Sequence, residues 1–182
     1  MTEHTILFSS DISPQSANNF AAILSGLAQN RATKLILGIN SPGGNVVAGM
    51  LLYHTLVAMP FEVVTHNVSN VDSIANVIFM AGSTRLACQG ATFMFHGVGF
   101  DSNPAERLEE KNLREKLDVI TADHRRIASV ISSQSALTVK GCMGLFSKQS
   151  TRGADWALQK NVIHQIADFT YPANGNFYTF FG

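Results

Sequence analysis

Residues 39–45 read Ile39-Asn40-Ser41-Pro42-Gly43-Gly44-Asn45 and separate an apolar run, 34–39, from an amphipathic segment, 46–57. An apolar run, a tight turn and a helical pattern in this order predict a junction between a β-strand and an α-helix. Gly43 and Gly44 have no Cβ, so their backbone can adopt positive φ angles and approach a ligand closely. Their N–H groups would lie near the positive end of the following helix, where they can donate to an oxyanion or to a phosphate.

Two further strand ends carry side chains that could react. Ser73 follows a strand-like run, 61–68, and a predicted turn, 69–72, and it opens a short apolar helical segment; His96 ends a later apolar strand. Glycine and proline occur in most turns, and a serine before a helix is usually an N-cap, so neither feature alone predicts chemistry. The three strand ends together would supply backbone donors, a hydroxyl and an imidazole, which are the groups that a serine hydrolase needs.

The apolar periodicity alternates between the strand and the helix pattern along the whole chain. This alternation predicts an α/β fold with a mainly parallel sheet and helices packed on it. The strands are expected at 5–8, 34–40, 61–68, 84–88, 91–96 and 162–169, and the helices at 14–30, 46–59, 73–81, 104–133, 136–146 and 153–161. The aromatic tail, 171–182, is expected either to dock on a neighbouring surface or to be disordered.

The helix predicted at 104–133 is long for a chain of this size. Asn103-Pro104-Ala105-Glu106 has the pattern of a helix start, with a cap, a proline and a glutamate in the first turn. A helix of this length spans about 42 Å, whereas the domain should be only about 35–40 Å across. Its apolar stripe would therefore stay partly uncovered unless a second copy of the chain covers it, and we expect a homo-oligomer. The stripe consists of Leu113, Leu117, Ile120, Ile127 and Ile131.

Composition limits the possible partners. The 13 basic residues equal the 13 acidic residues, so no positive field predicts binding to nucleic acid. No apolar stretch is long enough to span a membrane, and Met1-Thr2-Glu3-His4 does not begin a signal peptide. Cys88 and Cys142 form neither a disulfide framework nor a metal-ligand spacing, and two reduced thiols fit a cytoplasmic protein. We expect neither a metal nor a cofactor.

From about Ile6 to Ile166 the chain resembles the Clp protease proteolytic subunit (ClpP) and related Clp-fold serine peptidases. The resemblance rests on three motifs in order, namely Asn40-Ser41-Pro42-Gly43-Gly44, then Ser73 opening a helix that ends at Ala81-Gly82, and then Met94-Phe95-His96. Around Ser73 this chain reads Val71-Asp72-Ser73-Ile74-Ala75-Asn76, where the family usually has small residues and then Ser-Met. The resemblance implies a ClpP/crotonase-like fold in one domain, 1–182, with the 104–133 helix as a projecting handle that joins two rings.

The resemblance also implies a role for each matching residue. Ser73 stands at the position of the nucleophile, His96 at that of the general base, and the N–H groups of Gly44 and Ile74 at the oxyanion hole. The implied reaction is hydrolysis of peptides or proteins through an acyl-enzyme on Ser73. The third member of the triad is an acid in the family, but counting back from the final strand places Gln149 at that position in this chain. A glutamine can orient an imidazole but stabilises the imidazolium less than a carboxylate does.

Two other functions remain open. Because Gln149 replaces an acid, the chain could be a weak or inactive ClpP-like assembly subunit. A crotonase-type acyl-CoA enzyme also uses backbone oxyanion donors, but Asp72 is the one acid near the turns and no basic cluster awaits a CoA phosphate. Family members that work under a Clp ATPase have an additional N-terminal segment before the first strand. This chain begins almost at that strand, which argues against dependence on a Clp ATPase and leaves an ATP-independent or a partner-dependent peptidase open.

Overall fold

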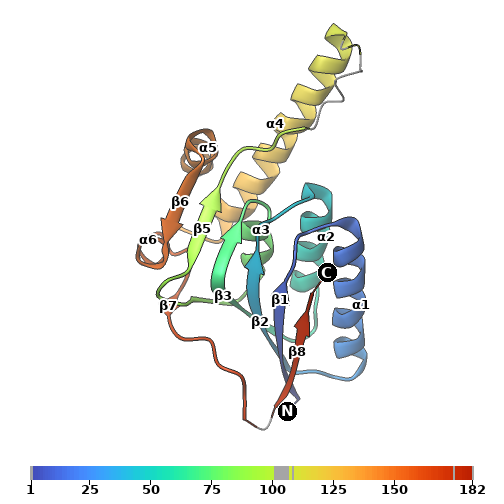
Figure 1. The fold of residues 1–182 in the computed structure, drawn as a ribbon, viewed down its shortest axis with the longest axis vertical. Coiled ribbons are helices and arrows are strands. Elements are labelled where there is room, and N and C mark those ends of the chain that lie inside the picture. Colours follow the sequence, from blue (N-terminus) through green and yellow to red (C-terminus); the bar gives the residue numbers. More distant parts are fainter. Residues whose placement is uncertain (1, 101–106, 108, 174, 182) are drawn as a thin grey trace.

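A computed structural model describes residues 2–100, 107, 109–173 and 175–181, and it has strands and helices in alternation (Figure 1). The elements are β1 (Glu3–Ser9), α1 (Pro14–Gln29), β2 (Lys34–Ser41), α2 (Val46–Val57), β3 (Glu62–Asp72), α3 (Ala75–Phe79), β4 (Thr84–Ala87), β5 (Thr92–Phe95), α4 (Glu110–Ser133), α5 (Val139–Lys148), β6 (Ser150–Gly153), α6 (Ala154–Gln159), β7 (Gln165–Ile166) and β8 (Asn176–Phe180). The eight strands of the described residues belong to one sheet, with the order β6-β5-β3-β2-β1-β8; in addition, β4 pairs with β3, and β7 pairs with β4. Every pairing is parallel except that of β5 with β6, which confirms the predicted α/β class.

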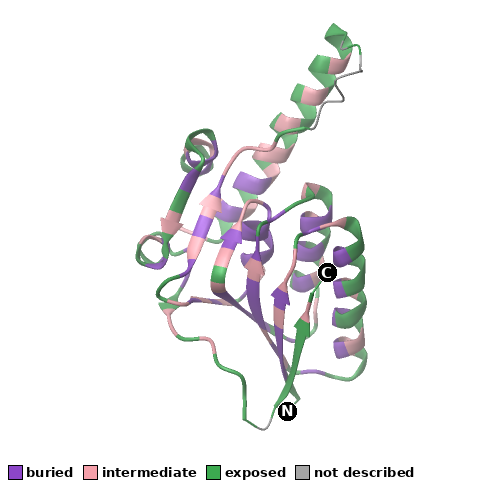
Figure 2. Cartoon of the chain, viewed as in Figure 1, coloured by how far each residue is buried: buried purple, intermediate pink, exposed green. Residues whose placement is uncertain are grey.

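The core lies between the sheet and the helices α1, α2 and α3 (Figure 2). The strands contribute alternating buried apolar residues, and the helices contribute the apolar positions of one face. Phe20 of α1, Leu52 of α2 and Phe79 of α3 are each at most 1% exposed. This packing fixes the carboxyl ends of β2, β3 and β5, from which the candidate site residues follow.

The strand β3 is longer than predicted, because it extends through the turn expected at 69–72. Its pairing with β2 shifts register between Ile39 and Ser41, so a bulge bends this end of the sheet. Up to Asn67, β3 pairs with β4; from Asn70 it pairs with β5 instead. The change of partner brings the end of β3 beside the end of β5, and α3 correspondingly begins at Ala75 rather than at Ser73.

The C-terminal region also differs from its prediction. Of the strand expected at 162–169, only the two residues of β7 form a strand. The segment after β7 runs across the sheet, where Nε2 of the buried His66 is hydrogen-bonded to the carbonyl of Ala167 at 3.0 Å. Burial lowers the pKa of His66, so this imidazole is a neutral anchor for the segment. The tail then forms β8, which pairs with β1 along His4–Phe8, and Phe180 stacks on Phe8 at 5.1 Å. The sequence analysis did not anticipate this additional strand.

The helix α4 projects from the body of the protein, as predicted (Figure 1). It ends at Ser133 as expected but begins at Glu110, because Glu109 has extended backbone angles and its N–H donates to Asn112 Oδ1. The predicted start at Pro104 lies outside the described residues. Of the predicted stripe, Ile127 and Ile131 are buried in the body, whereas Leu113 and Leu117 are 40% and 58% exposed. No helix in the described part of the chain is both long and apolar enough to cross a membrane.

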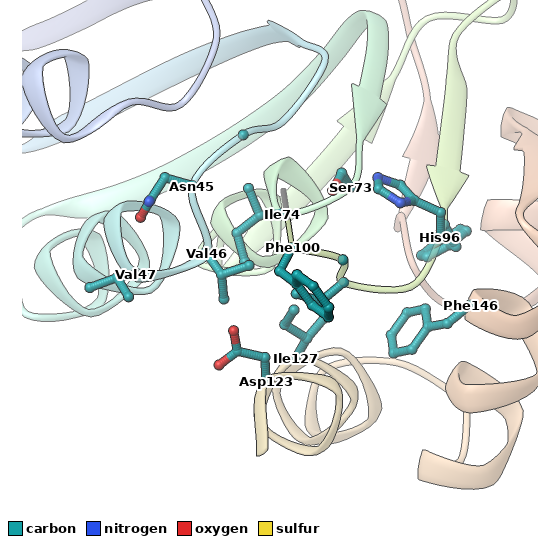
Figure 3. Close-up of a pocket in the computed structure, with 14 residues that line it drawn as sticks. Asn45, Val46, Val47, Ser73, Ile74, His96, Phe100, Asp123, Ile127 and Phe146 are labelled. Atoms are coloured by element: carbon teal, nitrogen blue, oxygen red, sulfur yellow. The ribbon is translucent and has the colours of Figure 1, made fainter. Parts of the chain in front are cut away.

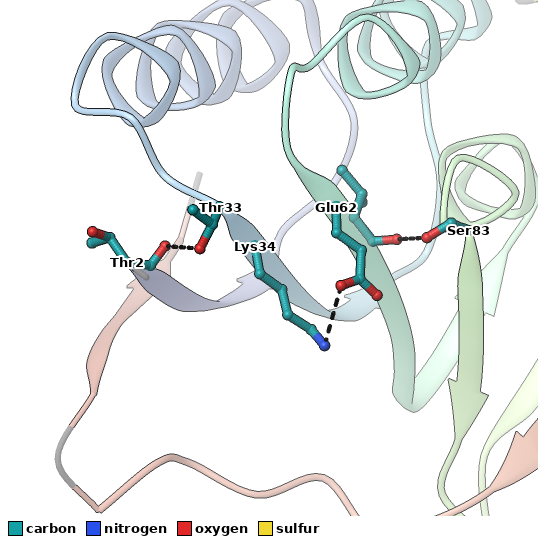
Figure 4. A network of polar contacts seen from close by, with 6 residues as sticks. Thr2, Thr33, Lys34, Glu62 and Ser83 are labelled. Atoms are coloured by element: carbon teal, nitrogen blue, oxygen red, sulfur yellow. Dashed lines mark hydrogen bonds and ion pairs between the residues drawn. The ribbon is translucent and has the colours of Figure 1, made fainter.

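Polar contacts connect neighbouring strands at their amino ends, which lie opposite the carboxyl ends that carry the candidate site (Figure 4). Thr33 Oγ1 donates to the carbonyl of Thr2, and Ser83 Oγ donates to that of Val63. Lys34 and Glu62 form an ion pair at 3.4 Å between the first residues of β2 and β3. Because Glu62 is nearly half exposed, this pair stabilises the fold only weakly. These contacts lie at the amino ends of the strands, so they contribute no group to the site at the carboxyl ends.

Candidate active site

The glycine turn after β2 has a geometry that only glycine tolerates. Gly43 and Gly44 have φ angles of 89° and 146°, and a Cβ on Gly44 would lie 2.3 Å from the carbonyl oxygen of Ile12. The segment before α1 holds the turn, because Ile12 N–H donates to Gly43 O at 2.8 Å and Asn45 N–H donates to Ile12 O at 2.6 Å. Asn45 then caps α2 through its side chain. The predicted strand–turn–helix junction is therefore present.

Two backbone N–H groups, one in the glycine turn and one at the start of α3, lack an acceptor among the described residues. Among the described residues, neither the N–H of Gly44 nor that of Ile74 donates a hydrogen bond, and both residues line the same pocket. A Cβ on Gly43 would lie 3.3 Å from the nitrogen of Ile74, so the turn and the start of α3 are in close contact. Two converging donors without a partner are the arrangement that stabilises a developing oxyanion.

Ser73 has a strained backbone conformation between β3 and α3. Its φ is 57°, in the left-handed region that residues other than glycine adopt infrequently. Its N–H donates to Met94 O at 2.8 Å, and the buried Asn76 donates from Nδ2 to both Ser73 O and Met94 O. These contacts hold Ser73 at a tight strand-to-helix turn with its side chain in the pocket. Strain of this kind persists where the surroundings impose it and is concentrated at functional sites.

His96 follows β5 directly and lies beside Ser73, with its imidazole turned toward the serine side chain (Figure 3). The pairing of Asn70–Asp72 with Thr92–Met94 sets these neighbouring strand ends. The segment after His96 is fixed by α4, because Val98 N–H donates to His124 Nε2 at 2.7 Å. The structure thus brings together four of the five residues that the sequence analysis selected, namely Gly44, Ser73, Ile74 and His96.

Gln149 is the selected residue that does not line this pocket. The antiparallel pairing of β5 with β6 ends at Phe95 and Ser150, so His96 and Gln149 are next in register. Gln149, however, ends α5 in the left-handed conformation, with φ 48°, and its side chain is exposed. In the described part of the chain, no hydrogen bond joins it to His96. Its position therefore matches the register of a third triad member, but its side chain does not contact the imidazole.

The pocket has a volume of about 620 Å³ and receives residues from four helices or their ends. The glycine turn and Ser73 form one side, and α4 and α5 form the other (Figure 3). The sequence analysis missed the members from α4 and α5, because they lie 50 residues or more beyond Ser73 and no local motif marks them. These members are Asp123, Ile127 and Phe146. No group of three or more His, Cys, Asp or Glu residues suited to a metal ion occurs among the described residues.

Comparisons with known proteins agree with this geometry. The family model described as "Clp protease" matches residues 1–168. The chain is 27% identical over 144 residues to the "ATP-dependent Clp protease proteolytic subunit 1" of Leifsonia xyli, covering 76% of this chain and 70% of that protein. It is 32% identical over 173 residues to the "ATP-dependent Clp protease proteolytic subunit 2" of Corynebacterium glutamicum, covering 92% and 81%. A solved structure, that of a ClpP1 point mutant from Listeria monocytogenes, has the same fold, with a TM-score of 0.77, 18% identity and 91% coverage of both chains.

Proposed function

Because the chain belongs to the Clp protease family of serine peptidases, we propose that it hydrolyses peptide bonds through an acyl-enzyme on Ser73. The observation that carries this proposal is the meeting of Ser73, His96 and the unused N–H groups of Gly44 and Ile74 in one pocket. A serine hydroxyl is a weak nucleophile at neutral pH, so it needs a base nearby and donors for the oxyanion. In this proposal His96 is the base and the N–H groups of Gly44 and Ile74 are the donors, so the reaction uses no cofactor.

In the proposed mechanism, His96 takes the proton of the Ser73 hydroxyl while Oγ attacks the carbonyl carbon of the substrate. The carbonyl oxygen becomes an oxyanion, and the N–H groups of Gly44 and Ile74 donate to it. The imidazolium of His96 then protonates the leaving amine as the carbon–nitrogen bond breaks. Water, deprotonated by His96, attacks the acyl-enzyme and releases the second product, and the proton returns through His96 to Ser73.

The direct test is labelling with a fluorophosphonate, which reacts with activated serines, followed by measurement of the intact mass. We expect the folded protein to gain a single adduct, and peptide mapping should place it on Ser73. Absence of an adduct on the folded protein would contradict the proposal, because the geometry would then not activate the hydroxyl.

The substrates that we propose are peptides and unfolded protein segments, because the chain belongs to a peptidase family and Ser73 lines a pocket of about 620 Å³. The two relatives described above are named as subunits of an ATP-dependent protease. Hydrolysis of short peptides by the purified chain, in the absence of ATP and of any second protein, would support the proposed peptidase activity.

Gln149 allows a specific prediction about the third position. His96 and Gln149 directly follow and precede the paired residues Phe95 and Ser150, so an aspartate at 149 would lie next to the imidazole in register and could accept its N–H. We expect Gln149→Asp to raise kcat/KM for a peptide substrate at least about 10-fold, because a carboxylate stabilises the imidazolium. Gln149→Ala should stay within about 3-fold of the wild type, because the exposed amide does not contact His96. A lower rate for the aspartate variant would contradict this assignment of the third position.

We further propose that copies of the chain associate through α4. Leu113 and Leu117, one helical turn apart on the projecting part of α4, are exposed apolar residues that a second copy could cover. We expect the double variant Leu113→Glu/Leu117→Glu to sediment as a smaller species than the wild type at micromolar concentration. Leu158→Glu on α6, also an exposed leucine, is the matched control and should not change the sedimentation. Unchanged sedimentation of the double variant would exclude α4 as the contact.

A second candidate function is a ClpP-like assembly subunit without activity, and the exposed, neutral Gln149 is the observation that favours it. Self-association without any labelling of Ser73 would support this alternative. An acyl-CoA enzyme of the crotonase type is less favoured, because none of the described residues that line the pocket is a lysine or an arginine for a CoA phosphate.

A further inference from the structure

Among the described residues, one carboxylate lines the pocket that contains Ser73. Asp123 lines this pocket from α4, and its side chain is only 13% exposed. The walls around it are apolar, with Val46, Val98, Phe100 and Ile127 among them. Placing a carboxylate in such surroundings costs free energy unless a positive or hydrogen-bonding group compensates its charge.

The described contacts of Asp123 satisfy only one of its two oxygens. Arg126, one turn further along α4, forms an ion pair with Asp123, in which an Nη lies 2.8 Å from Oδ1. Among the described residues, no other donor reaches the carboxylate, so Oδ2 keeps its full capacity to accept. None of the other described residues of the pocket wall carries a fixed charge. In the adjoining hollow along α4, Glu115 and Lys116 carry opposite charges, and the Lys116 ammonium lies 4.5 Å from the centre of the Phe100 ring.

Asp123 is not placed to serve as the third member of the triad. Figure 3 shows its carboxylate on the opposite side of the pocket from Ser73 and His96, near the start of α2. Its negative charge therefore faces the space that a substrate side chain would enter, rather than the imidazole. An apolar pocket with a carboxylate at its far side suits a side chain that has a long aliphatic stem and a cationic end.

We infer that Asp123 makes the pocket select lysine or arginine as the substrate residue whose carbonyl Ser73 attacks. This inference rests on the proposed function, because it assumes that the bound peptide places this residue next to Ser73. The aliphatic stem of the substrate side chain packs on the apolar wall, and its cationic group donates to Asp123 Oδ2. Arg126 keeps its contact with Oδ1, so the bound cation shares the carboxylate with it.

The test uses coumarin-linked tetrapeptides that differ only at the residue before the scissile bond, with arginine, citrulline or leucine there. Citrulline has nearly the shape of arginine but no charge, so the ratio of kcat/KM between these two isolates the charge. For the wild type we expect a ratio of about 10 or more, as for a charge-assisted hydrogen bond in a partly dry site. Asp123→Asn should lower the ratio to about 2 or less, and the leucine substrate reports any general change in rate that the substitution causes.

Asp118→Asn is the matched control, because Asp118 lies on the same helix, carries the same charge and is exposed outside the pocket. This variant should keep the wild-type ratio, and a loss there would mean a general effect of net charge. A ratio near 1 in the wild type, or one that survives Asp123→Asn in a folded protein, would overturn the inference and leave Ser73 chemistry intact.

Binding to the inactive variant separates this inference from the proposed function. With Ser73→Ala, a fluorescent peptide that carries arginine should bind about 10-fold more tightly than its citrulline counterpart. Additional replacement of Asp123 by Asn should remove that difference. If the wild type hydrolyses nothing while the binding difference persists, the proposed function fails and the assignment of Asp123 stands. Equal binding of both peptides overturns the assignment.

Discussion

Replacing Ser73 with alanine is expected to lower kcat/KM for peptide substrates at least about 10⁴-fold, close to the background of the preparation. The reason is that the acyl-enzyme forms on the Ser73 hydroxyl, and no other hydroxyl among the described residues lines the pocket. The oxyanion donors are backbone N–H groups, so they remain in the variant and account for any residual rate. The measurement is hydrolysis of a fluorogenic peptide, together with fluorophosphonate labelling of both proteins.

The structure also predicts what this substitution leaves unchanged. The fold around position 73 depends on backbone contacts, namely Ser73 N–H with Met94 O and Asn76 with Ser73 O, which alanine can also make. The variant should therefore sediment as the wild type does and melt within a few degrees of it. Ser69→Ala is a suitable control, because Ser69 lies on β3 outside the pocket and should keep full activity. Activity retained by a clean Ser73→Ala preparation would exclude Ser73 as the nucleophile.

The motifs at the strand ends, together with the resemblance to the Clp peptidases, selected most of the residues that meet in the candidate site. The order of apolar runs, turns and helical patterns predicted β2, α2 and β5, and it predicted that the strands form a mainly parallel sheet. The strand ends drew attention to Gly44, Ser73 and His96, whereas their roles and the selection of Ile74 came from the resemblance to the Clp peptidases. The structure places all four residues in one pocket. These residues are predictable because parallel strands with helical crossovers place their carboxyl ends at one edge of the sheet.

The parts that were missed depend on contacts between distant segments. Asp123 and Phe146 come to the pocket because α4 packs on α3 and α5, and nothing in their local sequence indicates this. The aromatic tail was expected to dock elsewhere or to be disordered, yet β8 pairs with β1, and Phe180 packs on both Phe8 and Phe20. A short aromatic segment has a similar pattern whether it forms an edge strand or docks as a tail.

Replacing Gly44 with alanine is expected to lower kcat/KM about 10³-fold, even though the substitution adds only a methyl group. The added Cβ would lie 2.3 Å from Ile12 O, which is backbone and already accepts from Asn45 N–H, and the φ of 146° is unfavourable for alanine. The turn must shift to relieve this overlap, and the Gly44 N–H then leaves the oxyanion position.

The matched control for Gly44→Ala is Gly26→Ala, the same change in the helix α1, where a Cβ would meet no atom within 4 Å. That variant should keep full activity and gain up to about 1 kcal/mol of stability, because alanine favours the helix. The two variants therefore separate the effect of the turn from that of the added methyl.

If the backbone donors act on the oxyanion, Gly44→Ala should slow acylation of Ser73 by the fluorophosphonate and peptide hydrolysis together. If Gly44→Ala keeps the wild-type rate in a folded protein, the Gly44 N–H is not an oxyanion donor, and stabilisation of the charge must come from Ile74 and other groups of the pocket.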